Sequence, residues 1–293
     1  MRVLEQIKRQ LERQLKISLQ SGRFTKIEGG DVNTAYQLKT ATQSWFIKLN
    51  KAELLFMFEV EAAGLNELEK VQCVRVPKVI VIGIADNYAY LVLEYLSLRS
   101  LSVLSERLFA EQLARQHLQP QSYFGWFQTN TIGSTRQENG YYTDWGLFWQ
   151  QQRLGKQLSL AAEKGYIGKL QRNGEKLNVQ LTDLFSNYFV QPALLHGDLW
   201  RGNVAADNEN QPVMFDPACY YGDREADIAM TELFAGFSAD FYAVYQAHYP
   251  LDPGYSVRKT LYNLYHILNH LNLFGSGYLR QAEIMIEKLL AQL

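Results

Sequence analysis

The chain has 293 residues, 47% of them hydrophobic and 20% charged, and its 29 basic side chains nearly balance 30 acidic ones. This apolar fraction supports a packed core and is too high for a disordered chain. A net charge of −1 provides no basic field for nucleic acid, so no nucleic-acid partner is expected.

Cysteine content and the N-terminal residues point to an intracellular setting. Cys73 and Cys219 are too few for a disulfide framework or a cysteine-based zinc site. The N-terminus is charged throughout and does not resemble a signal peptide, and no run approaches the roughly 18 apolar residues that span a membrane. We therefore expect a soluble, cytoplasmic protein with no membrane partner.

The first 96 residues predict a small lobe built on a five-stranded sheet. Apolar residues at three- and four-residue steps indicate an amphipathic helix over 4–15. Three strands follow within 24–50, separated by a glycine turn and a polar turn. A helical pattern over 52–70 precedes two more apolar strands that end near residue 96.

From residue 97 onward helical patterns dominate, and they predict a larger helical lobe over 97–293. An irregular stretch, 123–149, is rich in Gly, Asn, Thr and aromatic residues and is expected to be a functional loop. Helices are expected over 103–118, 145–165, 177–190, 224–236, 239–248, 256–273 and 277–292. The fold class is α+β, with two lobes and a cleft between them.

The strongest chemical signal is LLHGDLWRGN, which ends at Asn203 and is followed by an apolar strand that ends at Asp216. Phosphoryl transfer needs a carboxylate that accepts the proton of the attacking hydroxyl, and Asn and Asp ligands for Mg²⁺. The spacing resembles the H-x-D-x-x-x-x-N catalytic loop of protein kinases and small-molecule kinases. It assigns Asp198 as the catalytic residue, with Asn203 and Asp216 as metal ligands; a solvated loop with a capping Asp is the alternative.

Lys48 lies in the alternating strand WFIKLN, where an inward-facing lysine is unusual. Kinases place a lysine there to contact ATP phosphates, paired with a Glu from the following helix. Glu61 is the expected partner and Glu59 its competitor. A charge on an edge strand is the alternative explanation for Lys48.

The glycine turn between the first two strands is a second candidate for the nucleotide. Its residues Gly29, Gly30 and Asn33 precede Lys48 by one strand. Backbone amides in such a turn can cradle phosphate, although a two-glycine hairpin is commonly only a turn.

The connection between the lobes holds Glu94, Tyr95 and Leu96. In kinase-like folds the backbone of this connection contacts adenine. Any residue type can serve there, so the expectation rests on topology alone.

Polar residues on the helix LYNLYHILNHLN form a candidate substrate pocket. His266 and His270 are four residues apart and share a face, but no third metal ligand is evident. His270 and Asn269 are instead candidates for substrate contact. Asp227 is expected either to cap its helix or to accept backbone N–H groups of the catalytic loop.

Longer segments resemble the fructosamine kinase (ketosamine-3-kinase) family almost end to end. They include HGDLWRGNVAAD, FDPACYYGDREADIAMTELFAGF, LYNLYHILNHLNLFG and the upstream pattern FGW…N…IG…T…N…W…W…R. Generic aminoglycoside and choline kinases share only the skeleton around Asp198, Asn203 and Asp216. The resemblance implies a protein-kinase-like fold of the aminoglycoside-phosphotransferase type, with a small antiparallel N-lobe.

The family phosphorylates the 3-hydroxyl of ketosamines with ATP and Mg²⁺, and the unstable product releases the amine, which reverses glycation. The resemblance implies the site roles given above and places Trp200 where it could stack on the sugar. Some members carry a redox-active cysteine after the two glycines, but Asp31 stands there. No redox-linked dimer is therefore expected, and the oligomeric state is not readable from the sequence.

Two alternatives stay open at this point. One is a kinase for another hydroxylated amine, such as an aminoglycoside or choline. The other is a nucleotide-binding module without activity. The preferred ketosamine, free or protein-bound, is not determined by the sequence.

Overall fold

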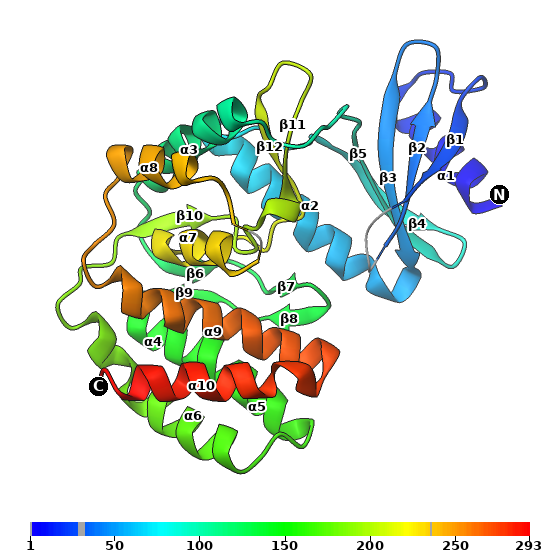
Figure 1. Cartoon of the computed structure of the whole chain (residues 1–293). Helices are drawn as coiled ribbons and strands as arrows, with labels where there is room; N and C mark the ends of the chain where they lie inside the picture. Colours follow the sequence, from blue (N-terminus) through cyan, green and yellow to red (C-terminus); the bar gives the residue numbers. More distant parts are fainter. Residues whose placement is uncertain (1, 29–32, 235) are drawn as a thin grey trace.

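The computed structural model describes residues 2–28, 33–234 and 236–293. A small sheet lobe stands beside a larger, mainly helical lobe (Figure 1). The small lobe contains α1 (Arg2–Leu15), β1 (Arg23–Ile27), β2 (Thr34–Lys39), β3 (Ser44–Lys51), α2 (Leu55–Val71), β4 (Val79–Ala85) and β5 (Tyr88–Glu94).

The five strands of the small lobe form one antiparallel sheet in the order β1-β2-β3-β5-β4. The amphipathic face of α1 covers one side of this sheet, and α2 lies on the other side. Because successive side chains of a strand point to opposite faces, Trp45, Ile47 and Leu49 of β3 pack toward α1. Lys48 of the same strand therefore faces α2 and the larger lobe.

The larger lobe begins with α3 (Val103–His117), so the predicted boundary at 96/97 lies in the segment between β5 and α3. Its short strands are β6 (Phe124–Trp126), β7 (Asn130–Ile132), β8 (Thr135–Gln137), β9 (Gly140–Tyr142), β10 (Pro192–Leu195), β11 (Val204–Ala206), β12 (Pro212–Met214) and β13 (Tyr220–Asp223). Its further helices are α4 (Trp145–Trp149), α5 (Gly155–Glu163), α6 (Lys169–Gln180), α7 (Arg224–Leu233), α8 (Ala239–His248), α9 (Tyr255–Phe274) and α10 (Leu279–Leu290).

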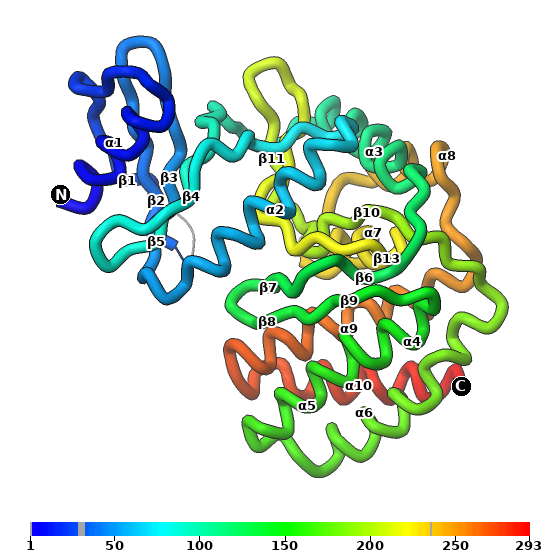
Figure 2. The backbone as a smooth tube through the Cα atoms, turned by 180° about the vertical axis from the view of Figure 1, so that it is seen from behind, coloured from blue at the N-terminus to red at the C-terminus, as the bar shows by residue number. Residues whose placement is uncertain are grey.

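Helix α9 is the axis of this lobe, because α5, α7 and α10 all pack against it. Twelve of its residues are buried. A four-stranded sheet, β10-β13-β6-β9, lies above α9 and supports the loops that carry the candidate site. Figure 2 shows the β7–β8 hairpin reaching out beside α2, which β7 contacts.

Two predicted segments are corrected by the structure. The stretch 123–149 is not an irregular loop but four short strands and a helix. The strands pair within the stretch, β6 with β9 and β7 with β8, and β6 also pairs with the distant β13. The helix expected over 177–190 is displaced: α6 covers Lys169–Gln180, where Leu170, Gly174 and Leu177 form the buried stripe. A 3₁₀ turn, Leu181–Phe185, follows it.

The expected helix over 145–165 also differs in detail. It is interrupted by a π-helical turn, Gln150–Leu154, between α4 and α5. This turn carries Arg153, which is completely buried. In the part of the chain that the structure describes, no helix combines the length and apolar character needed to cross a membrane.

Candidate active site

Lys48 contacts two carboxylates, one from each lobe. Its Nζ lies 2.6 Å from Glu61 Oε1 on α2 and also contacts Asp216 Oδ1 of the larger lobe. Burial alone would lower the pKa of Lys48, but the two carboxylates outweigh it and raise the pKa above the ordinary value. The expected partner is thus Glu61, while Glu59 is exposed. An edge-strand position is excluded, because β3 is paired on both sides.

The loop after β10 brings Asp198 and Asn203 together. Asn203 Nδ2 donates to the backbone oxygen of Asp198 at 2.9 Å and to its Oδ2 at 3.2 Å. Burial, with the nearby Asp216 and Asp227, raises the pKa of Asp198 to about 7, although the Asn203 bond opposes the shift. Such a carboxyl is suited to proton transfer near neutral pH.

Gly197 shows why this loop needs a glycine. Its φ is +81°, and a Cβ there would lie 2.2 Å from the backbone oxygen of Ala218. The close approach joins the Asp198 loop to the segment that follows Asp216, because Ala218 N also donates to His196 O at 2.9 Å. Asp216 itself has a left-handed φ of 58°, an uncommon backbone conformation for a residue other than Gly or Asn.

Asp227 is the residue that holds the catalytic loop in place. Its Oδ2 accepts from His196 N at 2.8 Å and its Oδ1 from Gly197 N at 2.9 Å. His117 Nε2 lies 3.3 Å from the same carboxylate. The capping alternative is wrong, because α7 is capped by Asp223, whose side chain accepts from Glu225 N.

Asp216 and Asn203 provide oxygen atoms of the kind that Mg²⁺ prefers. One Asp216 oxygen contacts Lys48, and its side chain is 49% exposed toward the cleft. The Asn203 nitrogen is used in both bonds to Asp198, which leaves its Oδ1 for a cation. Among the described residues no three His, Cys, Asp or Glu side chains cluster as metal ligands. The donor set therefore fits an ion that substrate phosphates help to hold.

The residues of the glycine turn are the next expected nucleotide contacts. Gly29, Gly30 and the neighbouring Asp31 lie outside the described residues. Asn33 accepts a hydrogen bond from Asn50 on β3 through its side chain, at 2.7 Å.

The residues of the inter-lobe connection also have defined places. The Glu94 side chain points to Arg75, at 3.0 Å. Tyr95 and Leu96 are half-buried in the extended segment after β5.

Of the three expected substrate residues, Trp200 is the most open. Its side chain is 37% exposed, and its indole lies over Gly202, where a Cβ would come within 2.3 Å of the ring. Trp200 thus packs on Gly202 of its own loop with part of the indole left open, and its role at the substrate stays a prediction. His270 is half-buried among the rings of Phe234, Phe274 and Tyr278.

Asn269 points into the lobe rather than toward the catalytic loop. It is buried, with its Nδ2 3.4 Å from Ile132 O and its Oδ1 3.4 Å from Gln157 Nε2. The structure therefore does not bring Asn269 into contact with Asp198, and its role at the substrate stays a prediction.

Sequence reasoning missed a buried polar network behind Asp216. Asn130 Nδ2 donates to Cys219 O at 2.7 Å, and Gln137 Nε2 donates to Ala218 O at 3.2 Å. Arg153 holds the same hairpin through Asn139 Oδ1, at 2.7 Å. Several of these residues belong to the N…N…R pattern of the upstream family motif, which was noted without a function. The network positions the backbone just after Asp216.

Comparison with known proteins agrees with this geometry. The model of the fructosamine kinase family matches residues 3–292. The protein named Probable ketoamine kinase of Vibrio parahaemolyticus is 43% identical over 97% of this chain and 98% of its own length. The chloroplastic protein-ribulosamine 3-kinase of Arabidopsis thaliana is 39% identical over 91% of this chain and 82% of its own.

Solved structures extend the likeness to three dimensions. A crystal structure of a fructosamine-3-kinase candidate from Haemophilus somnus superposes with a TM-score of 0.89 at 31% identity, covering 99% of this chain and 98% of that one. A choline kinase from Streptococcus pneumoniae reaches a TM-score of 0.64 at 17% identity, covering 98% and 99%, which shows a shared fold alone. The expected kinase-like α+β fold is confirmed.

Proposed function

The chain belongs to the fructosamine kinase family, and we propose that it transfers the γ-phosphoryl group of ATP to the 3-hydroxyl of ketosamines. The observation that carries this proposal is the meeting of Lys48 from the small lobe with Asp216, beside the Asp198–Asn203 pair. The proposal assigns phosphate binding to Lys48, cation binding to Asp216 and proton acceptance to Asp198.

On the phosphate side, Lys48 is held by Glu61 so that its ammonium can neutralise ATP phosphate oxygens. Asp216 and Asn203 would hold Mg²⁺, which supplies positive charge to the phosphates when bound. Because Asp216 already contacts Lys48, its carboxylate would interact with both the Lys48 ammonium and Mg²⁺ when the ion binds.

On the acceptor side, Asp198 orients the sugar hydroxyl and accepts its proton as the oxygen attacks phosphorus. Its carboxylate is aimed by Asn203, and its loop by Asp227. The exposed indole of Trp200 offers a flat face for the ketose or a cation–π contact for its protonated amine. The 3-phosphoketosamine would then eliminate and release the free amine.

A kinase for choline or an aminoglycoside is the weaker candidate. Likeness to a choline kinase is confined to the fold, whereas the family match covers almost the whole chain. An inactive module is disfavoured because Lys48, Asp198, Asn203 and Asp216 are all present, with Lys48 in contact with Asp216 and Asn203 in contact with Asp198.

An ADP-release screen tests the proposal. The purified chain would be given MgATP with fructosyl-, ribulosyl- and erythrulosyl-lysine, and with choline and kanamycin as comparison acceptors. We expect ADP release with at least one ketosamine well above the acceptor-free rate. Turnover of choline or kanamycin without turnover of any ketosamine would contradict the proposal.

A further inference from the structure

The β11–β12 hairpin carries both proposed metal ligands at its open end. Asn203 directly precedes β11, and Asp216 follows the end of β12 by two residues. The hairpin turn lies at the opposite end and is closed by Asp207, whose Oδ1 accepts from the backbone N–H groups of Glu209 and Gln211, both at 2.9 Å. A shift of the turn would therefore be transmitted along a short rigid ribbon to the metal ligands.

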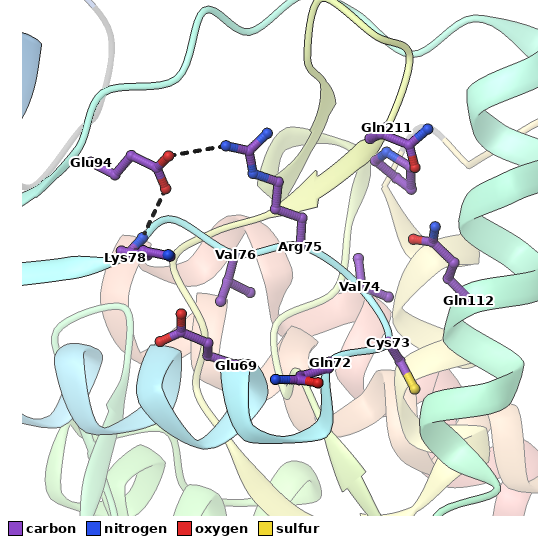
Figure 3. Close-up of a pocket in the computed structure, with 11 residues that line it drawn as sticks. Glu69, Gln72, Cys73, Val74, Arg75, Val76, Lys78, Glu94, Gln112 and Gln211 are labelled. Atoms are coloured by element: carbon purple, nitrogen blue, oxygen red, sulfur yellow. Dashed lines mark hydrogen bonds and ion pairs between the residues drawn. The ribbon is translucent and has the colours of Figure 1, made fainter. Parts of the chain in front are cut away.

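Arg75 fastens this turn to the connection between the lobes. Its Nη1 lies 2.7 Å from Asp207 Oδ2, and its Nη2 lies 3.0 Å from Glu94 Oε1 at the end of β5. Figure 3 shows the Arg75 guanidinium extended toward Glu94. The backbone adds a third link, since Met214 N donates to Arg75 O at 2.9 Å.

Arg99 holds the same turn from the other side of the connection. Its Nε donates to Asp207 O at 3.1 Å and its Nη2 to Asn208 O at 3.0 Å. Its backbone exchanges two hydrogen bonds with Ala206, at 2.8 and 2.9 Å. Two arginines, one before β4 and one after β5, thus grip a single turn.

A surface pocket borders this junction. It has a volume of about 510 Å³, lies beside Arg75 and is lined by Gln72, Cys73, Gln112 and Gln211 among others (Figure 3). Val74 and Val76, on either side of Arg75, are buried in the core, whereas the Arg75 side chain provides polar links to Glu94 and Asp207. The Arg75 side chain is 41% exposed, and ion pairs this open contribute little to stability.

From these contacts we infer that Arg75 is a positioning residue, which aligns Asn203 and Asp216 with the nucleotide by holding the Asp207 turn against Glu94. The inference rests on the proposed kinase function. The role requires a planar guanidinium, because two carboxylates on different elements are contacted by two different nitrogen atoms. A lysine would have to bring both carboxylates to one nitrogen atom, whereas the guanidinium contacts them through two separate nitrogen atoms.

The test compares Arg75→Gln and Arg75→Lys with the matched control Lys78→Gln, a lysine on the rim of the same cavity. For each full-length chain, the dissociation constant of MgATP, the Mg²⁺ concentration at half-maximal rate, kcat and the melting temperature are measured. Both Arg75 variants should raise the first two quantities about 10-fold, as expected for coupled sites. Lys78→Gln should stay within about two-fold of wild type.

Melting temperatures should change by no more than about 2 °C in all three variants, because the Arg75 side chain is 41% exposed and Lys78 is exposed as well. In a double-mutant cycle, adding Asp207→Asn to Arg75→Gln should bring little further loss of MgATP affinity. Full additivity would overturn the inference.

Three further outcomes distinguish a failure of this inference from a failure of the proposed function. If wild type binds MgATP and Arg75→Gln behaves like Lys78→Gln, the positioning role is overturned. A lower melting temperature with unchanged MgATP affinity and Mg²⁺ dependence would overturn it as well, in favour of a purely structural role. If wild type itself binds no MgATP, the proposed function fails, and the inference with it.

Discussion

The phosphate half and the acceptor half of the site are built in different ways. The phosphate half consists of charges that meet across the lobes, with Lys48 and Glu61 from the small lobe and Asp216 from the larger one. The acceptor half lies within one lobe, where buried Asp227 fixes the loop that carries Asp198 through two backbone N–H groups. The acceptor half is therefore preassembled, whereas the phosphate half depends on how the lobes are aligned.

This difference implies that nucleotide affinity and turnover can be separated by mutation. Changes in the phosphate half should weaken both, because the same charges bind ATP and stabilise the transferring phosphoryl group. Changes in the acceptor half should lower turnover and leave nucleotide affinity nearly intact.

The largest effect should come from Lys48→Met in the phosphate half. Removing this cation should lower kcat/KM for ATP by about 100-fold or more, as loss of one electrostatic contact to a developing charge typically does. Lys51→Met is the control, since that lysine ends the same strand and its side chain is 74% exposed. Steady-state kinetics at varied ATP measure both. If both variants lose only a similar small part of kcat/KM for ATP, Lys48 does not carry the phosphate half of the site.

Asp227→Asn should act on the acceptor half alone. The Asn side chain has one oxygen and one NH₂ group, so one of the two backbone N–H groups would face another donor and lose its acceptor. Losing this hydrogen bond should lower the free energy of unfolding by about 1–3 kcal/mol. We expect a lower melting temperature and a kcat reduced about 10-fold through the displaced Asp198 loop, with MgATP affinity unchanged by calorimetry. Asp240→Asn, in an exposed ion pair with Arg107, should change none of these. A large loss of MgATP affinity in Asp227→Asn would show that the halves are not separable.

A smaller effect is expected from Trp200→Phe. The shorter ring keeps an aromatic face but reduces the stacking area, so KM for the ketosamine should rise about 2- to 10-fold. KM for ATP and the melting temperature should barely change, because the indole is exposed rather than packed in the core. A melting temperature several degrees lower with unchanged ketosamine KM would show instead that Trp200 supports the loop.

The smallest effect concerns the pH dependence of stability. Burial lowers the pKa of His117, although Asp227 opposes the shift. The unfolded chain therefore binds the proton more readily, and stability present above pH 6.5 is lost as the pH falls below it. His117→Gln should flatten the decline of the unfolding free energy between about pH 6.5 and 5, measured by urea titration. An unchanged slope would show that His117 stays neutral in both states or charged in both.

Much of this site could be predicted from local sequence patterns. Strand alternation placed Lys48 on the inward face, and the helical step to Glu61 placed its partner opposite. The short spacing from Asp198 to Asn203 keeps both in one loop, so their contact could be predicted without a fold. Resemblance to the family supplied the substrate, which no local pattern contains.

What could not be predicted depends on contacts between distant segments. Asp227 is not the N-cap of α7, because Asp223, the residue directly before the helix, occupies that position. Arg153 reaches the segment after Asp216 through Asn139 and Asn130, and its guanidinium lies over the ring of Tyr220. The link from Arg75 to Asp207 spans 132 residues. Hydrophobic periodicity carries no information about such polar partners.

The most direct test of the division between the halves is the Asp198→Asn variant, with MgATP affinity and ketosamine turnover measured on the same preparation. Asp198, the proposed proton acceptor, belongs to the preassembled half, and the described contacts of Lys48 are with Glu61 and Asp216 instead. The account predicts a MgATP dissociation constant within about two-fold of wild type and turnover reduced by about 100-fold or more. Turnover above a few per cent of wild type, or loss of MgATP binding together with turnover, would contradict it.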